Sequence, residues 1–115
     1  MKNQINDKAR FLHILEAIEE INNYVANCDY DEFLLHSMMK NATVRQLEII
    51  GEAASHLSQE IRTSNQDIDW EAIIGFRNII VHEYFGINYE IVWNTIKIDL
   101  EILEKRVKHI LISFP

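Results

Sequence analysis

Apolar residues recur every three to four positions along most of the chain, which is the spacing of one face of an α-helix. No run of residues shows the strict alternation of a half-buried β-strand, and glycine and proline are scarce. The first helix is expected over residues 6–27, with Asn6 or Asp7 capping its start. Its apolar stripe consists of Phe11, Ile14, Leu15, Ile18, Ile21 and Val25. The pattern therefore predicts an all-α fold.

The next segments continue this helical pattern after a predicted turn at residues 28–31. Asp31 is expected to cap a short helix over residues 32–39, which presents Phe33, Leu34 and Met38. A single long helix is then predicted from its apolar positions, which are Leu47, Ile50, Ala54, Leu57 and Ile61. Gly51, with the neighbouring alanines, would let another helix approach this one closely.

The second half begins with a predicted loop at residues 63–67, after which Asp67 or Asp69 can cap a helix. That helix is apolar on nearly all sides and contains Trp70, Ile73, Ile74, Phe76, Ile80 and Val81. Gly86 suits its C-terminal end, and Asn88 suits the cap of the final helix.

The final helix carries two apolar stripes and is therefore expected to need two packing partners. The main stripe consists of Val92, Ile96, Leu100, Leu103, Val107, Ile110 and Phe114. The second stripe consists of Ile91, Ile98 and Ile102. Together these elements predict a single domain over residues 1–115, built as a four- to five-helix up-and-down bundle.

Composition narrows the classes of function that the chain can have. Its 115 residues suffice for one domain, and its net charge of −7 does not favour nonspecific binding to a nucleic-acid backbone. Residues 11–96 carry four bases and fourteen acids. The single cysteine, Cys28, excludes an internal disulfide, and we expect a cytoplasmic protein because neither a secretion signal nor a membrane-spanning stretch is recognisable.

Polar residues interrupt the most apolar helix, in segment 75–86, where Arg77, Asn78, His82 and Tyr84 are the candidates for chemistry. Buried charge is unfavourable unless it is paired, so a functional role would explain why these residues stand there. A purely structural explanation is also open. Arg77 would then pair with a glutamate of the preceding long helix, while the histidine and tyrosine would be satisfied within the core.

Spacing limits how these side chains can meet. At about 100° per residue, Arg77 and Tyr84 fall on nearly the same face of a straight helix, whereas Arg77 and His82 are about 140° apart. Either the helix loosens near His82 or a second copy of the chain completes the site, as a two-fold axis would allow.

The string Arg77, four residues, His82, one residue, Tyr84 resembles the Arg-x4-His-x-Tyr motif of the HepT-like toxins in the HEPN superfamily. The flanking stretches 47–54 and 70–86 also resemble the two signature stretches of that family. The order, spacing and length agree, and the likeness extends over nearly the whole chain.

The resemblance implies a homodimeric helical ribonuclease, the toxin of a type VII toxin-antitoxin system, which cuts RNA without a metal or other cofactor. Arg77 and His82 of both copies would be catalytic at the dimer interface, and Asn78 would support RNA binding. The substrate would be a tRNA or an mRNA. An MntA-like nucleotidyltransferase antitoxin would inactivate the toxin by transferring AMP to Tyr84. No membrane partner is implied.

Two other classes of function stay open: a non-catalytic nucleotide- or partner-binding subunit of a nucleotidyltransferase complex, and a plain dimeric helical scaffold. Glu48 and Glu52 share a helix face and could be acid/base carboxylates, although pairing with Arg45 or Arg77 is the simpler interpretation. The scattered histidines and the C-terminal bases are weaker candidates, with surface or helix-dipole roles. These are His13, His36, His56 and His109, with Lys105, Arg106 and Lys108.

Overall fold

The structure, a computed structural model, describes residues 2–78 and 86–115, and all regular structure in these ranges is helical. The elements are α1 (Lys2–Val25), α2 (Tyr30–Leu35), α3 (Ser37–Ser55), α4 (Gln59–Ser64), α5 (Trp70–Gly75), the 3-10 turn η1 (Phe76–Asn78), α6 (Tyr89–Asn94), the π-helical segment η2 (Thr95–Asp99) and α7 (Leu100–Ile112). The prediction of an all-α fold is confirmed for the described residues. None of their helices is long and apolar enough to cross a membrane.

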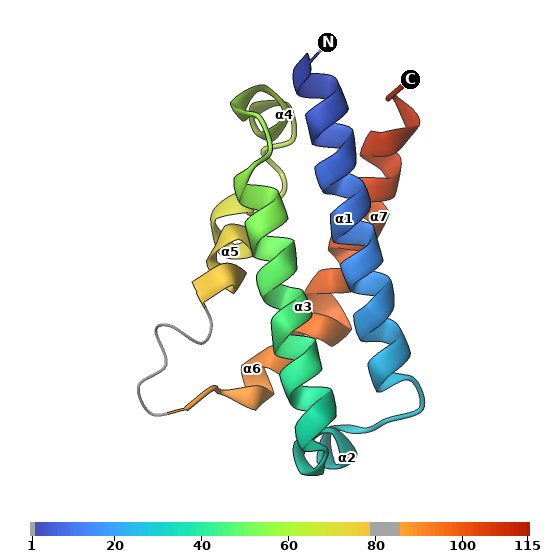
Figure 1. Cartoon of the computed structure of the whole chain (residues 1–115), viewed down its shortest axis with the longest axis vertical. Coiled ribbons are helices and arrows are strands. Elements are labelled where there is room, and N and C mark those ends of the chain that lie inside the picture. Colours follow the sequence, from blue (N-terminus) through green and yellow to red (C-terminus); the bar gives the residue numbers. More distant parts are fainter. Residues whose placement is uncertain (1, 79–85) are drawn as a thin grey trace.

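Three long elements form the body of the molecule, with α1 lying between α3 and α7 (Figure 1). Helix α5 and η1 pack against α3, and the two chain termini lie at the same end. The apolar stripes predicted for α1, α3 and α7 supply the core, where Phe11, Ile14, Ile21, Ile50 and Val107 are fully buried. Their burial removes apolar surface from water, which is the main force that holds the three elements together.

The start of α1 differs from the prediction, because the helix begins at Lys2 and neither Asn6 nor Asp7 caps it. Asp7 is instead buried in the second turn. Its carboxylate accepts hydrogen bonds from the Ser58 backbone N–H at 2.8 Å and from the Ser58 hydroxyl at 2.6 Å. Asp7 thus links α1 to the start of α4. These hydrogen bonds offset the unfavourable free energy of burying the Asp7 carboxylate.

The predicted short helix over residues 32–39 is also wrong in its bounds. Asp29, and not Asp31, caps α2, because its carboxylate accepts the Glu32 backbone N–H at 2.8 Å while the Glu32 side chain accepts the Asp29 N–H. The helix ends at Leu35, and His36 caps α3 by accepting the Met39 N–H at 3.1 Å. Met38 is consequently 79% exposed instead of facing the core.

The single long helix expected through Ile61 is divided in two. Helix α3 ends at Ser55, and Ser58 caps the separate helix α4 by accepting the Ile61 N–H at 3.2 Å. Because α4 extends to Ser64, the predicted loop at residues 63–67 is shorter than expected. The break lets Leu57 stay buried while the chain turns toward α5.

Two predicted caps are confirmed. The Asp69 carboxylate accepts the Ala72 N–H at 3.2 Å at the start of α5, and the Asn88 side chain accepts two backbone N–H groups at the start of α6. Gly86 has a φ of +100°, a left-handed conformation that favours glycine. The predicted helix that contains Trp70 to Val81 is α-helical from Trp70 to Gly75 and is followed by the 3-10 turn η1, while its positions Ile80 and Val81 lie outside the described residues.

The final helix is continuous but not uniform, since five π-helical residues separate α6 from α7. Its main stripe is buried from Val92 to Ile110, as predicted, and Phe114 is half-buried. The second stripe has no packing partner within the described residues: Ile91, Ile98 and Ile102 are 62%, 57% and 60% exposed. The chain therefore presents an apolar strip of surface along α6, η2 and α7.

Candidate functional site

Arg77 lies in η1, directly after α5, and close packing against α3 fixes its backbone. A Cβ atom on Gly51 of α3 would lie 2.5 Å from the Arg77 backbone nitrogen and 2.9 Å from the Ile73 carbonyl oxygen. Both distances are shorter than real Cβ contacts, so only glycine permits this approach. The close approach that Gly51 was predicted to allow is therefore confirmed, and its partner is the segment that carries Arg77.

The Arg77 guanidinium lies near a carboxylate of α3, and the same carboxylate contacts His56, the residue that follows α3. Its Nη1 lies 3.9 Å from Oε2 of Glu52, and Oε1 of Glu52 lies 2.9 Å from Nε2 of His56. The Arg77 and Glu52 side chains are 42% and 59% exposed, so their ion pair contributes at most about 1 kcal/mol. The predicted pairing of Arg77 with a glutamate of α3 is confirmed for Glu52, yet backbone packing positions Arg77 more firmly than this contact does.

A surface pocket of about 390 Å³ opens beside Arg77, between α1, α3 and η1. Its lining residues are Arg10, His13, Arg45, Glu48, Ile49, Glu52, Ala53 and Arg77. Three arginines and two glutamates thus line one pocket in a protein whose net charge is −7. Such an arrangement favours a negatively charged ligand, because guanidinium groups bind phosphate or carboxylate oxygens through planar, charge-assisted hydrogen bonds.

Of the other predicted site residues, Asn78 is half-buried and ends η1 one position after Arg77. His82 and Tyr84 lie outside the described residues, so their predicted meeting with Arg77 stays a prediction. Phe76–Asn78 form a 3-10 turn instead of continuing α5, so the angles calculated for a straight α-helix do not describe these three residues.

The C-terminal bases form specific contacts in addition to any effect on the helix dipole. Arg106 donates two hydrogen bonds to the Asp67 carboxylate, at 2.8 and 3.0 Å, and a third to the Asn65 side chain at 3.1 Å. This bidentate pair holds the pKa of Asp67 below its usual range. Lys105 and Lys108 pair with glutamates one turn earlier on α7.

Sequence reasoning missed Arg10, and it considered Arg45 only as a partner for the glutamates. The helical spacing of Arg45, Glu48 and Glu52, at intervals of three and four, was a signal that they share a face of α3. Arg10 gave no such signal, since only the packing of α1 beside α3 brings it to this pocket. Among the described residues, no group of three or more His, Cys, Asp or Glu side chains could hold a metal ion.

Comparisons with known proteins show which family the sequence resembles. The family model "Ribonuclease HepT-like" matches residues 14–110. "Putative RNase MJ1380" of Methanocaldococcus jannaschii is 36% identical over 88% of this chain and 93% of its own length. "Putative RNase TTE0752" of Caldanaerobacter subterraneus is 41% identical over 86% of this chain and 88% of its own length. "Probable ribonuclease HepT" of Thermococcus cleftensis is 32% identical over 79% of this chain and 83% of its own length.

No solved structure is significantly similar to this chain. The fold and the basic pocket define a small helical protein suited to an anionic ligand. With the family match extending over most of its length, the chain belongs to the HepT-like ribonuclease family.

Proposed function

We propose that this chain is the toxin of a type VII toxin-antitoxin system and cuts RNA without a metal, using Arg77 and His82. The single observation that carries the proposal is the position of Arg77, held by the Gly51 contact at the edge of a basic surface pocket. Membership of the HepT-like ribonuclease family supports it.

The chemistry needs one base, one acid and one group that binds the developing charge. Neutral His82 of one copy removes the proton from a ribose 2′-hydroxyl, whose oxygen attacks the adjacent phosphorus. The bond to the 5′ oxygen breaks, and protonated His82 of the other copy donates a proton to that leaving oxygen. Arg77 binds the non-bridging oxygens, where charge accumulates. The products carry a 2′,3′-cyclic phosphate and a 5′-hydroxyl, and Asn78 helps to orient the RNA.

A homodimer is part of this proposal because two histidines are required. The exposed strip of Ile91, Ile98 and Ile102 supports it, since an apolar strip of this kind on a small protein is typical of an interface. A groove of about 320 Å³ adjoins the strip, and both Ile102 of α7 and Phe76 of η1 line it. Phe76 immediately precedes Arg77, so a partner bound here would reach the segment that bears the proposed catalytic residue.

We propose Tyr84 as the point of control. An MntA-like nucleotidyltransferase antitoxin would catalyse attack of the Tyr84 hydroxyl on the α-phosphate of ATP, which leaves AMP on the tyrosine and releases pyrophosphate. The added phosphodiester is anionic, so it would repel an RNA phosphate and obstruct the cleft.

Growth of cells that express the chain tests the catalytic assignment. We expect growth arrest with the unaltered protein, and normal growth with Arg77→Ala or His82→Ala at equal abundance and with dimerisation intact. If both variants arrest growth as the unaltered protein does, the catalytic roles are wrong, and a binding subunit or scaffold becomes the better explanation.

Intact-mass measurement after co-expression with the antitoxin tests the control residue. We expect the toxin mass to rise by whole AMP units and Tyr84→Phe to prevent the gain, while Tyr89→Phe leaves it unchanged. A gain that persists in Tyr84→Phe would assign the modification to another residue.

A further inference from the structure

The basic pocket contains two arginines that the catalytic proposal does not use. Arg10 comes from α1 and Arg45 from α3, and both line the cavity that Arg77 borders. Within residues 5–78 and 86–115, neither forms an ion pair shorter than 4 Å. Their positive charges are therefore available to a ligand in the pocket.

Most basic residues elsewhere in the described part of the chain contact other groups, with Arg62 of α4 as an exception. Arg106 is bound by Asp67, and Lys105 and Lys108 pair along α7. Lys40 and Lys97 each lie over an aromatic ring. Residues 11–96 hold only four bases, and two of them, Arg45 and Arg77, line this one pocket. Positive charge is thus concentrated beside the candidate site.

We propose that Arg10 and Arg45 bind an RNA phosphate next to the one that is cut, as binding residues distinct from the catalytic pair. This inference rests on the proposed function, because it supplies the substrate. Arg45, His13 and Arg77 are exposed at the pocket, so the site suits a strand that passes across the surface. Guanidinium groups fit phosphate oxygens in planar pairs, which lysines cannot form.

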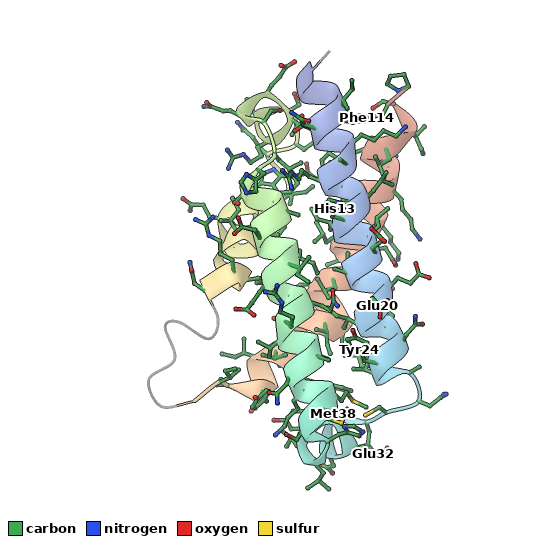
Figure 2. The ribbon with its side chains drawn as sticks, in the orientation of Figure 1. His13, Glu20, Tyr24, Glu32, Met38 and Phe114 are labelled. Carbon is green, nitrogen blue, oxygen red and sulfur yellow. The ribbon has the colours of Figure 1, made fainter. Side chains whose placement is uncertain are left out.

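An acidic pocket adjoins the proposed phosphate site and limits how far along α1 an RNA strand can bind. A second pocket of about 380 Å³ continues along α1 and α3 and shares His13 and Ile49 with the first. Glu16, Glu19 and Glu20 line it. Figure 2 shows His13 and then Glu20 in order along α1. RNA phosphates would be repelled from the Glu20 end, so the strand is held at the Arg10 end only.

Substrates of different length test the role of the two arginines. For Arg10→Gln and Arg45→Gln, we expect kcat/KM on an RNA oligonucleotide to fall about tenfold each. Cleavage of a dinucleoside monophosphate, which has only the scissile phosphate, should be unchanged. Lys105→Gln removes an equal charge from exposed α7 and should leave both substrates unaffected. Equal losses on the two substrates, or no loss on the oligonucleotide, would overturn the assignment.

Equilibrium binding separates this inference from the ribonuclease proposal. Fluorescence anisotropy with a 2′-O-methyl oligonucleotide, which cannot be cleaved by attack of the 2′ oxygen, should show about tenfold weaker binding for each arginine variant. The slope of log K against log salt should fall by about 0.7 for each lost phosphate contact. If the arginine variants bind the oligonucleotide more weakly but the wild-type protein cuts no RNA, the phosphate site is supported and the ribonuclease proposal is rejected. Unchanged affinity would reject the phosphate site.

A variant that is expected to strengthen RNA binding distinguishes a loss of charge from a loss of folding. Glu20→Gln removes a negative charge from the adjoining pocket and should strengthen oligonucleotide binding about twofold at low salt. A damaged fold would not produce a gain. Unchanged or weaker binding in Glu20→Gln would show that this carboxylate does not limit the RNA path.

Discussion

At the scale of single residues, the position of Arg77 depends on Gly51, which has no Cβ atom. Gly51 brings the α3 backbone against η1, and the salt bridge from Glu52, at 3.9 Å and exposed, adds little. Arg77 therefore keeps its place through backbone packing while its guanidinium remains available to a substrate. An arginine held by a short, buried ion pair would first have to break that pair.

Gly51→Ala tests this dependence. The new methyl group must displace the Arg77 backbone, so we expect a loss of about 1–3 kcal/mol in unfolding free energy and reduced RNA cleavage. Gly75→Ala is the matched control, because its Cβ would meet nothing within 4 Å among the described residues. It should be neutral or stabilise the protein by up to about 1 kcal/mol. Chemical denaturation measures both, and equal stabilities for the two variants would contradict the account.

At the scale of elements, the helical stripes of α1 and α7 were predictable, but the position of the break between α2 and α3 and the existence of the break between α3 and α4 were not. Leu57 and Ile61 continue the apolar period across the break, so the pattern conceals the cap that Ser58 provides. His36 caps α3 through a ring nitrogen, a role that sequence preferences give to serine, threonine, aspartate and asparagine. The spacing of apolar residues indicates which positions are buried. Buried positions can keep this spacing where one helix ends and the next begins, so the spacing alone does not locate the break.

The candidate site likewise contains residues that the sequence predicted and residues that it did not. The motif arginine and its glutamate partner were predictable because each belongs to a local helical pattern. Arg10 was not, since it reaches the pocket only through the packing of α1 against α3. Sequence spacing within one helix identifies residues on one face, whereas residues from separate helices meet through tertiary packing.

Helix α7 and the turn after α4 are joined by Arg106 and Asp67, which predicts a pH dependence. The pKa of Asp67 is lowered by its hydrogen bonds from Arg106, so this contact stabilises the fold above pH 4 and is lost as the pH falls through that lowered pKa. Asp67→Asn should lower the Tm at pH 7, and the difference from wild type should shrink as the pH falls from 4 through the lowered pKa of Asp67.

Glu19→Gln is the control for this titration, because Glu19 is exposed in the middle of α1 and makes no ion pair within 4 Å in the described part of the chain. Its Tm should follow that of the wild type across the whole pH range. A Tm difference for Asp67→Asn that is equally large at pH 7 and pH 3 would show that the ionised contact does not contribute.

At the scale of the whole molecule, net charge and local charge lead to different expectations. A net charge of −7 does not favour an extended grip on a nucleic-acid backbone, yet three arginines converge on one pocket. The acidic remainder would keep RNA away from other surfaces and so restrict contact to the cleft. A small basic site in an acidic protein thus fits selective contact with a few phosphates.

The exposed apolar strip predicts the assembly. Ile98→Glu or Ile102→Glu places a charge in the proposed interface, so the mass measured by light scattering should fall from dimer to monomer and RNA cleavage should fall with it. Leu35→Glu alters another exposed apolar residue, at the end of α2, and should leave the dimer intact. A dimer that persists in both isoleucine variants would place the interface elsewhere.

The most direct test of the central claim is cleavage of a defined RNA by the purified protein in the presence of a metal chelator, with the product ends identified. The account predicts cutting that yields 2′,3′-cyclic phosphate ends, no cutting of DNA of the same sequence, and at least about a hundredfold loss of rate in Arg77→Ala with an unchanged Tm. Absence of cleavage by the wild type, or an undiminished rate in Arg77→Ala, would contradict it.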